Sequence, residues 1–384
     1  MQQSDEWRIP LYKIYTDDED INLITKIVRR GAKWAIGPEI DEFETAIKNY
    51  VGAQYCACLN SGTSALHSLL LAYGLGKNDE MIIPSFSFIS TANSVLFVGG
   101  QPKFADIEDE TYGLDPADVI NKITTKTKAV IPVDYGGMSC KISEIKQITK
   151  NHNLLLIEDA AESLGSRVDG KKVGSFSDSA MFSFCGNKVL TTGEGGAIIT
   201  ESKDIYERVK LIRSHGRLDK ISYFNNPNES QYLDLGYNWR MSSITAALGI
   251  SQLKKLDKII KMRQENARYL SSRLSKHAQI NIPKPPKNYE HIYQMFTIRL
   301  NKSDLREKLQ NFLSEKRIFS KVYFAPIHLT EFYRNKFGTC NGSLPMTEKI
   351  SKQVLTLPLY PNMTNEEKNY LVDSIDEFFE QNNN

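Results

Sequence analysis

The chain has 384 residues, 41% of them hydrophobic, and a formal net charge of +2. This length is enough for a large buried core and for two domains. Lys and Arg are interspersed with Asp and Glu, which argues against a dedicated nucleic-acid-binding protein, because such a protein concentrates basic residues on one face. No apolar run approaches the length of a membrane-spanning helix, so we expect no membrane partner.

The five cysteines are expected to be free thiols. Their number is odd and their spacing is irregular, which is typical of a protein from a reducing compartment. Cys56 and Cys58 alternate along an apparent strand with no second Cys/His pair nearby, so we expect no metal site. The first eight residues lack the layout of a secretory signal peptide. The expected location is therefore the cytoplasm.

The first part of the chain alternates between helical and extended patterns. Pro38 suits the first position of a helix, and the apolar residues that follow it lie on one helical face. The run Tyr55–Leu59 has the composition of a buried strand. A second helix is expected to follow this strand and to end near Gly74.

The turn between this strand and the second helix is a candidate anion site. Gly62, Thr63 and Ser64 are small, so their backbone N–H groups can approach a ligand closely. Free N–H groups and the helix dipole favour a phosphate at such a helix start. Ser and Thr are also preferred N-cap residues in any protein, and taken alone the turn is better interpreted as an ordinary N-cap.

Apolar runs then alternate with helical segments as far as Ile157, which is typical of a mostly parallel sheet with helices on both faces. In such sheets ligands bind beyond the carboxyl ends of the strands. Asp159 follows the apolar run Leu154–Ile157 and lies at such an end. It is either an anion directed into a pocket or a helix N-cap or structural partner.

A single lysine lies in a glycine-rich loop between two further apolar runs. Ala180–Phe182 and Ala197–Ile199 predict buried strands, and Lys188 lies in the loop between them. Burial disfavours the charged form of an amine, and a neutral amine can form a Schiff base with a carbonyl compound or with pyridoxal phosphate. For a lone lysine a solvated position is the commoner one, so the interpretation depends on the residues around it.

The remainder of the chain predicts a connecting helix and a second domain. A long helix of about residues 242–274 is expected to join a large domain, residues 1–250, to a small C-terminal α+β domain, residues 251–384. Ahead of this helix, the polar segment 223–227 is expected to be a surface loop.

Within the small domain the patterns predict two strands and a capped helix. Alternation over His291–Ile298 and the apolar run Lys321–Phe324 predict the strands. Thr364 and Glu367 have the spacing of a capping box for the last helix.

Four of these features together match what pyridoxal phosphate requires of a protein. The cofactor needs a lysine, a carboxylate beside its pyridine nitrogen, a cradle for its phosphate and an aromatic ring over its face. Lys188, Asp159, the helix start at Gly62–Ser64 and Phe88 can supply them. Each follows an apparent strand, so all four can lie at one edge of the sheet.

At this point the chain resembles a known family. The sequence from Ser183 to Gly196 is similar to the signature of the DegT/DnrJ/EryC1 sugar aminotransferases, which are fold type I pyridoxal-phosphate enzymes. The resemblance covers nearly the whole chain and implies an α/β, aspartate aminotransferase-like fold. The other motifs that carry it are Gly37–Glu44, Asn60–Leu66, Pro84–Phe86, Glu158–Ala161 and Gly236–Met241.

The resemblance implies a role for each candidate residue. Lys188 would carry the Schiff base and move the proton between the cofactor and the sugar carbon. Asp159 would pair with the pyridinium, and Phe88 would stack on the ring. Glu162 would lie near the ring hydroxyl, at a position where the family more often has Gln. The residues that would hold the phosphate are Gly62, Thr63, Ser64, Ser183 and Asn238, the last reaching over from the second subunit of a homodimer.

The resemblance also implies a reaction. L-Glutamate would donate its amino group to a nucleotide-linked keto-deoxy sugar and leave as 2-oxoglutarate. The motif around Lys188 is similar to that of enzymes that aminate C4 of nucleotide-linked 4-keto-6-deoxyhexoses, including perosamine synthases. Related dehydratases carry His at this position, so Lys188 favours amino transfer. A dehydratase and a non-catalytic nucleotide-sugar binder of the same fold are the alternatives. Asp134 departs from the family, which often has His there.

Overall fold

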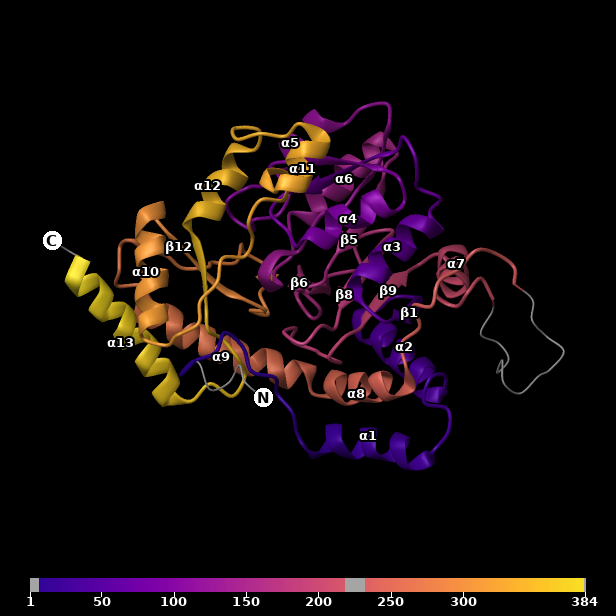
Figure 1. Ribbon diagram of the computed structural model, residues 1–384, viewed down its shortest axis with the longest axis horizontal. Helices are drawn as coiled ribbons and strands as arrows, with labels where there is room; N and C mark the ends of the chain where they lie inside the picture. Colours follow the sequence, from indigo (N-terminus) through magenta and orange to yellow (C-terminus); the bar gives the residue numbers. More distant parts are fainter. Residues whose placement is uncertain (1–6, 218–231, 383–384) are drawn as a thin grey trace.

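The computed structural model describes residues 7–217 and 232–382 (Figure 1). The segment 223–227, expected to be a surface loop, lies outside these residues. The centre is a seven-stranded sheet in the order β1-β9-β8-β5-β4-β2-β3. Its strands are β1 (Tyr55–Leu59), β2 (Glu80–Pro84), β3 (Gln101–Ala105), β4 (Thr127–Val130), β5 (Leu155–Asp159), β8 (Ser179–Ser183) and β9 (Gly196–Thr200).

The seven-stranded sheet is mostly parallel, as expected. Within the described residues β9 alone runs against the other strands, because it forms antiparallel ladders with both β8 and β1. The carboxyl ends of β1, β2, β5 and β8 therefore lie at the same edge of the sheet. The segments that follow these four strands contain most of the candidate site residues.

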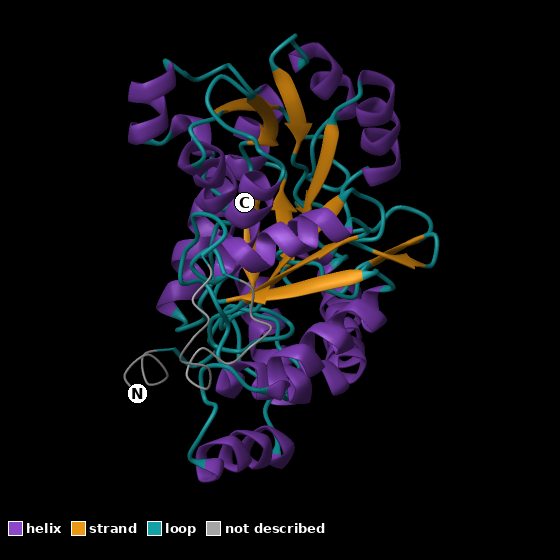
Figure 2. Ribbon diagram, turned by 90° about the vertical axis from the view of Figure 1, so that its right-hand side faces the viewer, coloured by secondary structure: helices purple, strands orange, loops and turns teal. Residues whose placement is uncertain are grey.

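Helices cover both faces of this sheet (Figure 2). On one face lie α3 (Gly62–Ala72), α4 (Ile89–Phe97) and α7 (Lys203–Arg213). On the other face lie α2 (Pro38–Val51), α5 (Pro116–Lys122), α6 (Ile142–His152) and α8 (Ser243–Lys254). The α/β class predicted from the alternation of patterns is confirmed.

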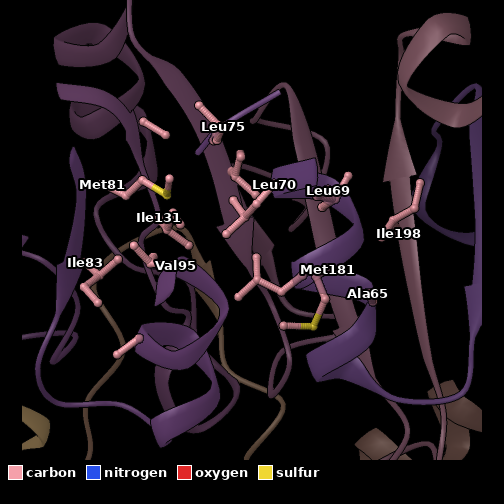
Figure 3. Packing of buried hydrophobic residues seen from close by; sticks show 14 of the residues in the cluster. Ala65, Leu69, Leu70, Leu75, Met81, Ile83, Val95, Ile131, Met181 and Ile198 are labelled. Carbon is pink, nitrogen blue, oxygen red and sulfur yellow. The ribbon is translucent and has the colours of Figure 1, made fainter. Parts of the chain in front are cut away.

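Side-chain alternation along the strands explains why both faces are buried. Successive residues of a strand point to opposite faces, so Ile83 packs with α3 and α4 while its neighbour Ile82 packs with α5 and α6. Figure 3 shows residues of the first of these layers, among them Leu69 of α3, Val95 of α4 and Ile198 of β9. Strands that are buried on both faces consist of nearly continuous apolar residues, which is the pattern seen in the sequence.

The predicted helix of residues 242–274 is wrong in one respect, because the structure contains two helices. These are α8 and α9 (Leu256–Leu274), separated at Lys255, where the backbone has φ −104° and ψ 4°. The Lys255 ammonium forms ion pairs with Asp17 and, at 3.0 Å, with Asp20. These acids belong to α1 (Asp18–Arg30) and its N-cap, and α1 packs along α8.

The C-terminal part has its own core and sheet. The sheet contains β10 (Ile280–Asn281), β12 (Phe296–Leu300) and β13 (Val354–Leu357). Around it lie α10 (Ser303–Glu315), α12 (Pro345–Gln353) and α13 (Asn365–Asn382), while α11 (Glu331–Phe337) packs against the large sheet. The expected capping box is present: the Thr364 hydroxyl accepts from the Glu367 amide at 3.1 Å, and the Thr364 amide donates to the Glu367 carboxylate at 2.8 Å.

Two predicted strands in this part are largely wrong. Within His291–Ile298 the strand begins only at Phe296, because the backbone of Ile292 and Met295 instead bonds to the carbonyls of Gly137 and Gly136. Within Lys321–Phe324 only Lys321 pairs with another strand, at Thr356. A third small sheet joins β11 (Tyr289–Glu290) to β6 (Arg167–Val168) and β7 (Lys171–Lys172).

The domain boundary at residues 250 and 251 stays a prediction. The C-terminal core includes Ile9, whose amide bonds to the Arg317 carbonyl at 3.2 Å, so an N-terminal residue packs with the last part of the chain. The start of α9 packs in the core beneath the large sheet through Leu256 and Ile260, and its end packs in the C-terminal core. In the described ranges, the structure has no helix that is both long and apolar enough to cross a membrane.

Candidate active site

Lys188 lies in the loop of residues 184–195 that joins β8 to β9. The Phe184 amide bonds to the Gly195 carbonyl and the Thr192 amide to the Phe184 carbonyl, both at 2.9 Å, so both ends of the loop are fixed. The Lys188 side chain is 12% exposed, and its Nζ lies 3.3 Å from Oε1 of Glu162. The lysine is therefore partly buried and paired, unlike a solvated lysine on a hairpin.

Glu162 connects this lysine to a second part of the site. Its other carboxylate oxygen, Oε2, accepts a hydrogen bond from the Gly136 amide at 2.9 Å. The Glu162 residue is 8% exposed. One buried carboxylate therefore fixes Lys188 relative to the turn that follows β4.

A glutamine from the C-terminal part holds the lysine loop. Gln294 accepts from the Val189 amide at 2.8 Å and donates to the Asn187 carbonyl at 2.7 Å. Arg263 of α9 donates in turn to the carbonyls of Tyr293 and Gln294 at 2.7 and 2.8 Å. The sequence gives no signal for Gln294, because its role depends on an approach between distant segments.

Asp159 ends β5 and is 3% exposed. Its Oδ2 accepts from the Thr91 hydroxyl at 2.7 Å and its Oδ1 from the Ala161 amide at 3.3 Å. Burial raises the pKa of Asp159 to about 6, against the lowering effects of the Thr91 hydrogen bond and the Lys188 charge. In the part of the chain that the structure describes, Asp159 has no ion-pair partner within 4.0 Å. A bound cation such as a pyridinium would supply the missing charge.

The start of α3 is capped by a serine and keeps two free N–H groups. The Ser61 hydroxyl caps the helix by accepting from the Ser64 amide at 3.1 Å, and the Ser64 hydroxyl bonds to Asn60. The N–H groups of Gly62 and Thr63, as at any helix start, have no intrahelical acceptor. A Cβ on Gly62 would lie 2.9 Å from the Ser183 Cβ and 3.2 Å from its Oγ, so Ser183 lies directly against the helix start. The cradle therefore fits a phosphate.

Phe88 and Asn238 lie differently from the buried residues. Phe88 is the N-cap of α4, one turn before Thr91, and its ring is 60% exposed. Asn238 is also exposed, in a segment held between the ends of β1 and α7: the Asn60 amide donates to the Trp239 carbonyl at 2.9 Å, and Asn238 forms a bridge with Ser214. The structure therefore brings Lys188 to Glu162 and Ser183 to Gly62, whereas Asn238 is exposed.

The unusual Asp134 lies apart from this site. It is fully buried and contacts Glu158, which points to the opposite face of the sheet from Asp159. Asp134 accepts from the Cys140 amide at 2.9 Å and from the Ser163 hydroxyl at 3.2 Å. Glu158 accepts from the Gly174 amide at 2.9 Å. The partners of Asp134 are thus structural, and they lie on the side of β5 away from Asp159.

A partly buried lysine, a buried carboxylate that lacks a cation and a free helix start lie at one edge of a mostly parallel sheet. This combination defines a pyridoxal-phosphate-dependent enzyme of fold type I. A model of the DegT/DnrJ/EryC1/StrS aminotransferase family matches residues 15–376, and the chain belongs to this family. The expected cofactor and enzyme class are therefore confirmed.

The relatives of the chain include sugar aminotransferases. It is 35% identical to the GDP-perosamine synthase of Escherichia coli O157:H7, over 89% of this chain and 91% of that protein. It is 32% identical to the UDP-4-amino-4,6-dideoxy-N-acetyl-beta-L-altrosamine transaminase of Campylobacter jejuni strain 81-176, over 94% of each. Among solved structures, the chain is similar to Helicobacter pylori PseC, an aminotransferase involved in the biosynthesis of pseudoaminic acid. The TM-score is 0.91 and the sequence identity is 28%, over 97% of this chain and 99% of that chain.

Proposed function

We propose that the protein transfers the amino group of L-glutamate to C4 of a nucleotide-linked 4-keto-6-deoxy sugar. The observation that carries the proposal is the pairing of Lys188 with Glu162 at the sheet edge where Asp159 lacks a cation. The named activities of the two relatives, a perosamine synthase and a 4-amino-4,6-dideoxy sugar transaminase, support the choice of a deoxy sugar and of C4.

In this proposal, separate residues bind the pyridine ring of the cofactor and transfer the proton. Asp159 pairs with the pyridine nitrogen, and Thr91 holds the Asp159 carboxylate in its charged form. Phe88 covers the ring. When bound, pyridoxal phosphate supplies the electron sink that makes the substrate C–H bond acidic. Lys188 then moves that proton.

The phosphate is proposed to lie at the start of α3. Gly62 and Thr63 offer backbone N–H groups, and the Ser183 hydroxyl lies beside them. The Ser64 amide is already capped by Ser61, so we assign Ser64 a role in shaping the turn. This arrangement places three donors and a helix dipole toward one dianion.

We further propose that the active unit is a homodimer in which Asn238 completes the partner's phosphate site. Support comes from the outward position of Asn238 and from the exposed apolar residues around it. Leu235 is 80% exposed, Phe97 55% and Tyr237 37%. Exposed apolar groups clustered in this way are typical of protein–protein contacts. The ring of His67, whose Nε2 is buried without a hydrogen-bond partner in the described structure, packs against Phe97 and Tyr237.

The first test is the absorbance of the protein loaded with pyridoxal phosphate, before and after L-glutamate is added without sugar. Loss of the visible cofactor band together with release of 2-oxoglutarate is expected. A band that glutamate leaves unchanged would contradict the amino donor and favour the dehydratase. A sugar product aminated at C3 would contradict the assignment of C4 while leaving the aminotransferase intact.

The second test replaces the lysine. Lys188→Arg keeps the charge next to Glu162 but cannot form a Schiff base, so the visible band and the turnover should both be lost. Lys203→Arg, at an exposed position on α7, is the matched control and should behave as the wild type. Substantial turnover by Lys188→Arg would falsify the role of Lys188.

A further inference from the structure

A cavity lies between the segments that follow β3 and β4 and the C-terminal sheet. Its volume is about 390 Å³, and its walls include Tyr112, Tyr135, Gly136, Met295 and Arg299. Volumes of this order are typical of small-molecule sites, about 300–1,000 Å³. None of the residues proposed to bind the cofactor lines it.

Arg299 is the buried charge of this cavity. Its side chain is 15% exposed, and its ion pair with Asp109 is long, 3.9 Å, to a partner that is 63% exposed. A long ion pair to an exposed partner contributes little to stability. Its Nε donates to Gln353 at 2.8 Å, and the guanidinium also interacts with Tyr112. A nearly buried guanidinium with so weak a counter-charge favours an anionic ligand.

A second cation lies at the mouth of the cavity. Lys284 lines it and is exposed, and within the described residues it has no ion pair within 4.0 Å. The neighbouring Pro283 and Pro285 restrict the backbone that carries it. Two acids also line the cavity: Glu110 is engaged by Lys141 at 3.4 Å, and Asp109 is the exposed partner of Arg299. Within the described residues, neither Arg299 nor Lys284 therefore has a close carboxylate partner.

The remaining walls suit an organic body attached to that anion. Met138, Ile282 and Met295 provide apolar surface, and the rings of Tyr112 and Tyr135 add flat faces. His291 also lines the cavity, and burial lowers its pKa to about 3, so it is neutral and adds no charge. The cavity thus combines two cations with apolar and aromatic surface.

The cavity wall is connected to the catalytic lysine by hydrogen bonds. The Gly136 amide donates to Glu162 Oε2 at 2.9 Å, and Glu162 Oε1 lies 3.3 Å from the Lys188 Nζ. The Gly136 carbonyl accepts from the amide of Met295, the residue after the Gln294 that holds the lysine loop. A ligand that displaced this wall would move Glu162.

We propose that this cavity is a second binding site for a small organic anion, a carboxylate or a phosphate monoester with an apolar body. The Arg299 guanidinium and the Lys284 ammonium bind the anion. Its occupancy is coupled to the Lys188 site through Gly136 and Glu162. The binding itself does not depend on the proposed function, whereas the coupling does, because it requires the cofactor to bind at Lys188.

The binding is tested by isothermal titration of the full chain with phenyl phosphate and with benzoate. At least one probe should bind with a Kd below about 1 mM, and the preferred probe tells a phosphate site from a carboxylate site. Arg299→Gln should weaken this binding about tenfold or more, and Lys284→Gln a few-fold. Lys287→Gln, a nearby lysine that does not line the cavity, is the matched control.

Two controls keep this test decisive. If Arg299→Gln disturbs the fold, Lys284→Gln still tests the effect of a lost cation on probe affinity, because the Lys284 side chain is exposed and its replacement should not affect folding. Ser183→Ala separates this cavity from the cradle at α3 and should leave the probe affinity unchanged. Absence of binding by both probes, or a loss of affinity in Ser183→Ala with none in the two cavity variants, would overturn the site.

The coupling is tested by measuring the probe Kd with and without saturating pyridoxal phosphate. Linkage requires the cofactor and the probe to change each other's affinity by the same factor. A difference between the two Kd values is expected, and Glu162→Ala should abolish it. Equal Kd values in the wild type, in the presence of probe binding and a visible cofactor band, would overturn the coupling.

Discussion

Two pairs of buried carboxyl groups behave differently at the scale of single residues. Glu162 and Asp159 face the site, where Lys188 and the proposed cofactor balance their charge. Asp134 and Glu158 face the other side of β5, where the donors are backbone amides and the hydroxyls of Ser163 and Ser177. Two carboxyl groups in contact cannot both ionise cheaply, so we expect this pair to share a proton.

This pair predicts a dependence of stability on pH. Burial raises the pKa of Asp134 to about 6 and that of Glu158 well above its usual value. The pKa of Asp134 is higher in the folded protein than in the unfolded chain, so ionisation of Asp134 destabilises the fold. The contribution of this carboxyl group to the free energy of unfolding is therefore largest below about pH 4 and is lost as the pH rises through about 6. Asp134→Asn cannot ionise and can donate to Glu158. The variant should gain on the order of 1–3 kcal/mol over the wild type above pH 6.

Thermal unfolding across this pH range measures the effect. Asp169→Asn, at an exposed position, is the control and should follow the wild type. Parallel curves of Tm against pH for Asp134→Asn and the wild type would show that the pair does not share a proton.

The Thr91 hydroxyl predicts an effect on cofactor affinity. Thr91→Val keeps the shape of the side chain but removes the donor to Asp159, so less of the carboxylate is charged at neutral pH. Hydrogen bonds to charged groups contribute about 1.5–3 kcal/mol, so the Kd for pyridoxal phosphate should rise about tenfold. Thr91→Ser keeps the hydroxyl and should bind the cofactor nearly as the wild type does. Equal affinities for Thr91→Val and Thr91→Ser would contradict this role.

Lys188 and Asp159 lie at the sheet edge that the sequence predicts for them, but their supports were not foreseen. Lys188 and Asp159 follow strands that the apolar runs identify, so their location depends only on local pattern. Thr91 and Gln294 act through contacts between segments far apart in the chain. A single sequence contains no pattern for such contacts.

At the scale of elements, close helix packing depends on one glycine. Gly249 lies in the middle of α8, where it packs on α2, and a Cβ there would lie 2.4 Å from the Phe43 ring. Glycine inside a helix costs about 1 kcal/mol relative to alanine. The close packing of α2 against α8 outweighs this cost, which explains why a glycine occupies position 249 although its helix propensity is low.

Gly249→Ala should therefore destabilise the protein although it improves helix propensity. Overpacking of this kind costs about 1–3 kcal/mol, which urea unfolding would measure as a lower midpoint. Gly76→Ala is the control, because a Cβ there would be in ordinary contact, 3.5 Å from the nearest atom. A midpoint for Gly249→Ala equal to or above the wild type would show that α2 can move away.

Element boundaries were the weakest part of the sequence interpretation, for a physical reason. The helical periodicity of residues 242–274 continues across Lys255, so no local pattern predicts that the helix is interrupted there. At the interruption, Lys255 forms ion pairs with Asp17 and Asp20, which are distant in the sequence. Likewise His291–Met295 alternates like a strand but bonds to the turn at Gly136 and Gly137. The strands of the large sheet were predicted well because burial on both faces leaves a continuous apolar run.

At the scale of the whole molecule, the proposed dimer predicts that subunits can complement each other. Lys188→Ala and Asn238→Asp should each be inactive as homodimers. When the two variants are co-expressed, half of the dimers are mixed, and each mixed dimer has one site with both native residues. Co-expression should therefore restore about a quarter of the wild-type activity. Size-exclusion chromatography verifies that dimers form, and co-expression without any recovery would place Asn238 in its own subunit's site.

The attachment of the lysine loop at two places limits how the molecule can move. The loop of residues 184–195 is fixed to the large sheet at its base, and Gln294 fastens it to the C-terminal part at Asn187 and Val189. A wide hinge rotation between the two parts would break both Gln294 bonds or carry the lysine away from Glu162. We therefore expect the proposed exchange of glutamate for the sugar to proceed without a wide rotation between the large sheet and the C-terminal part.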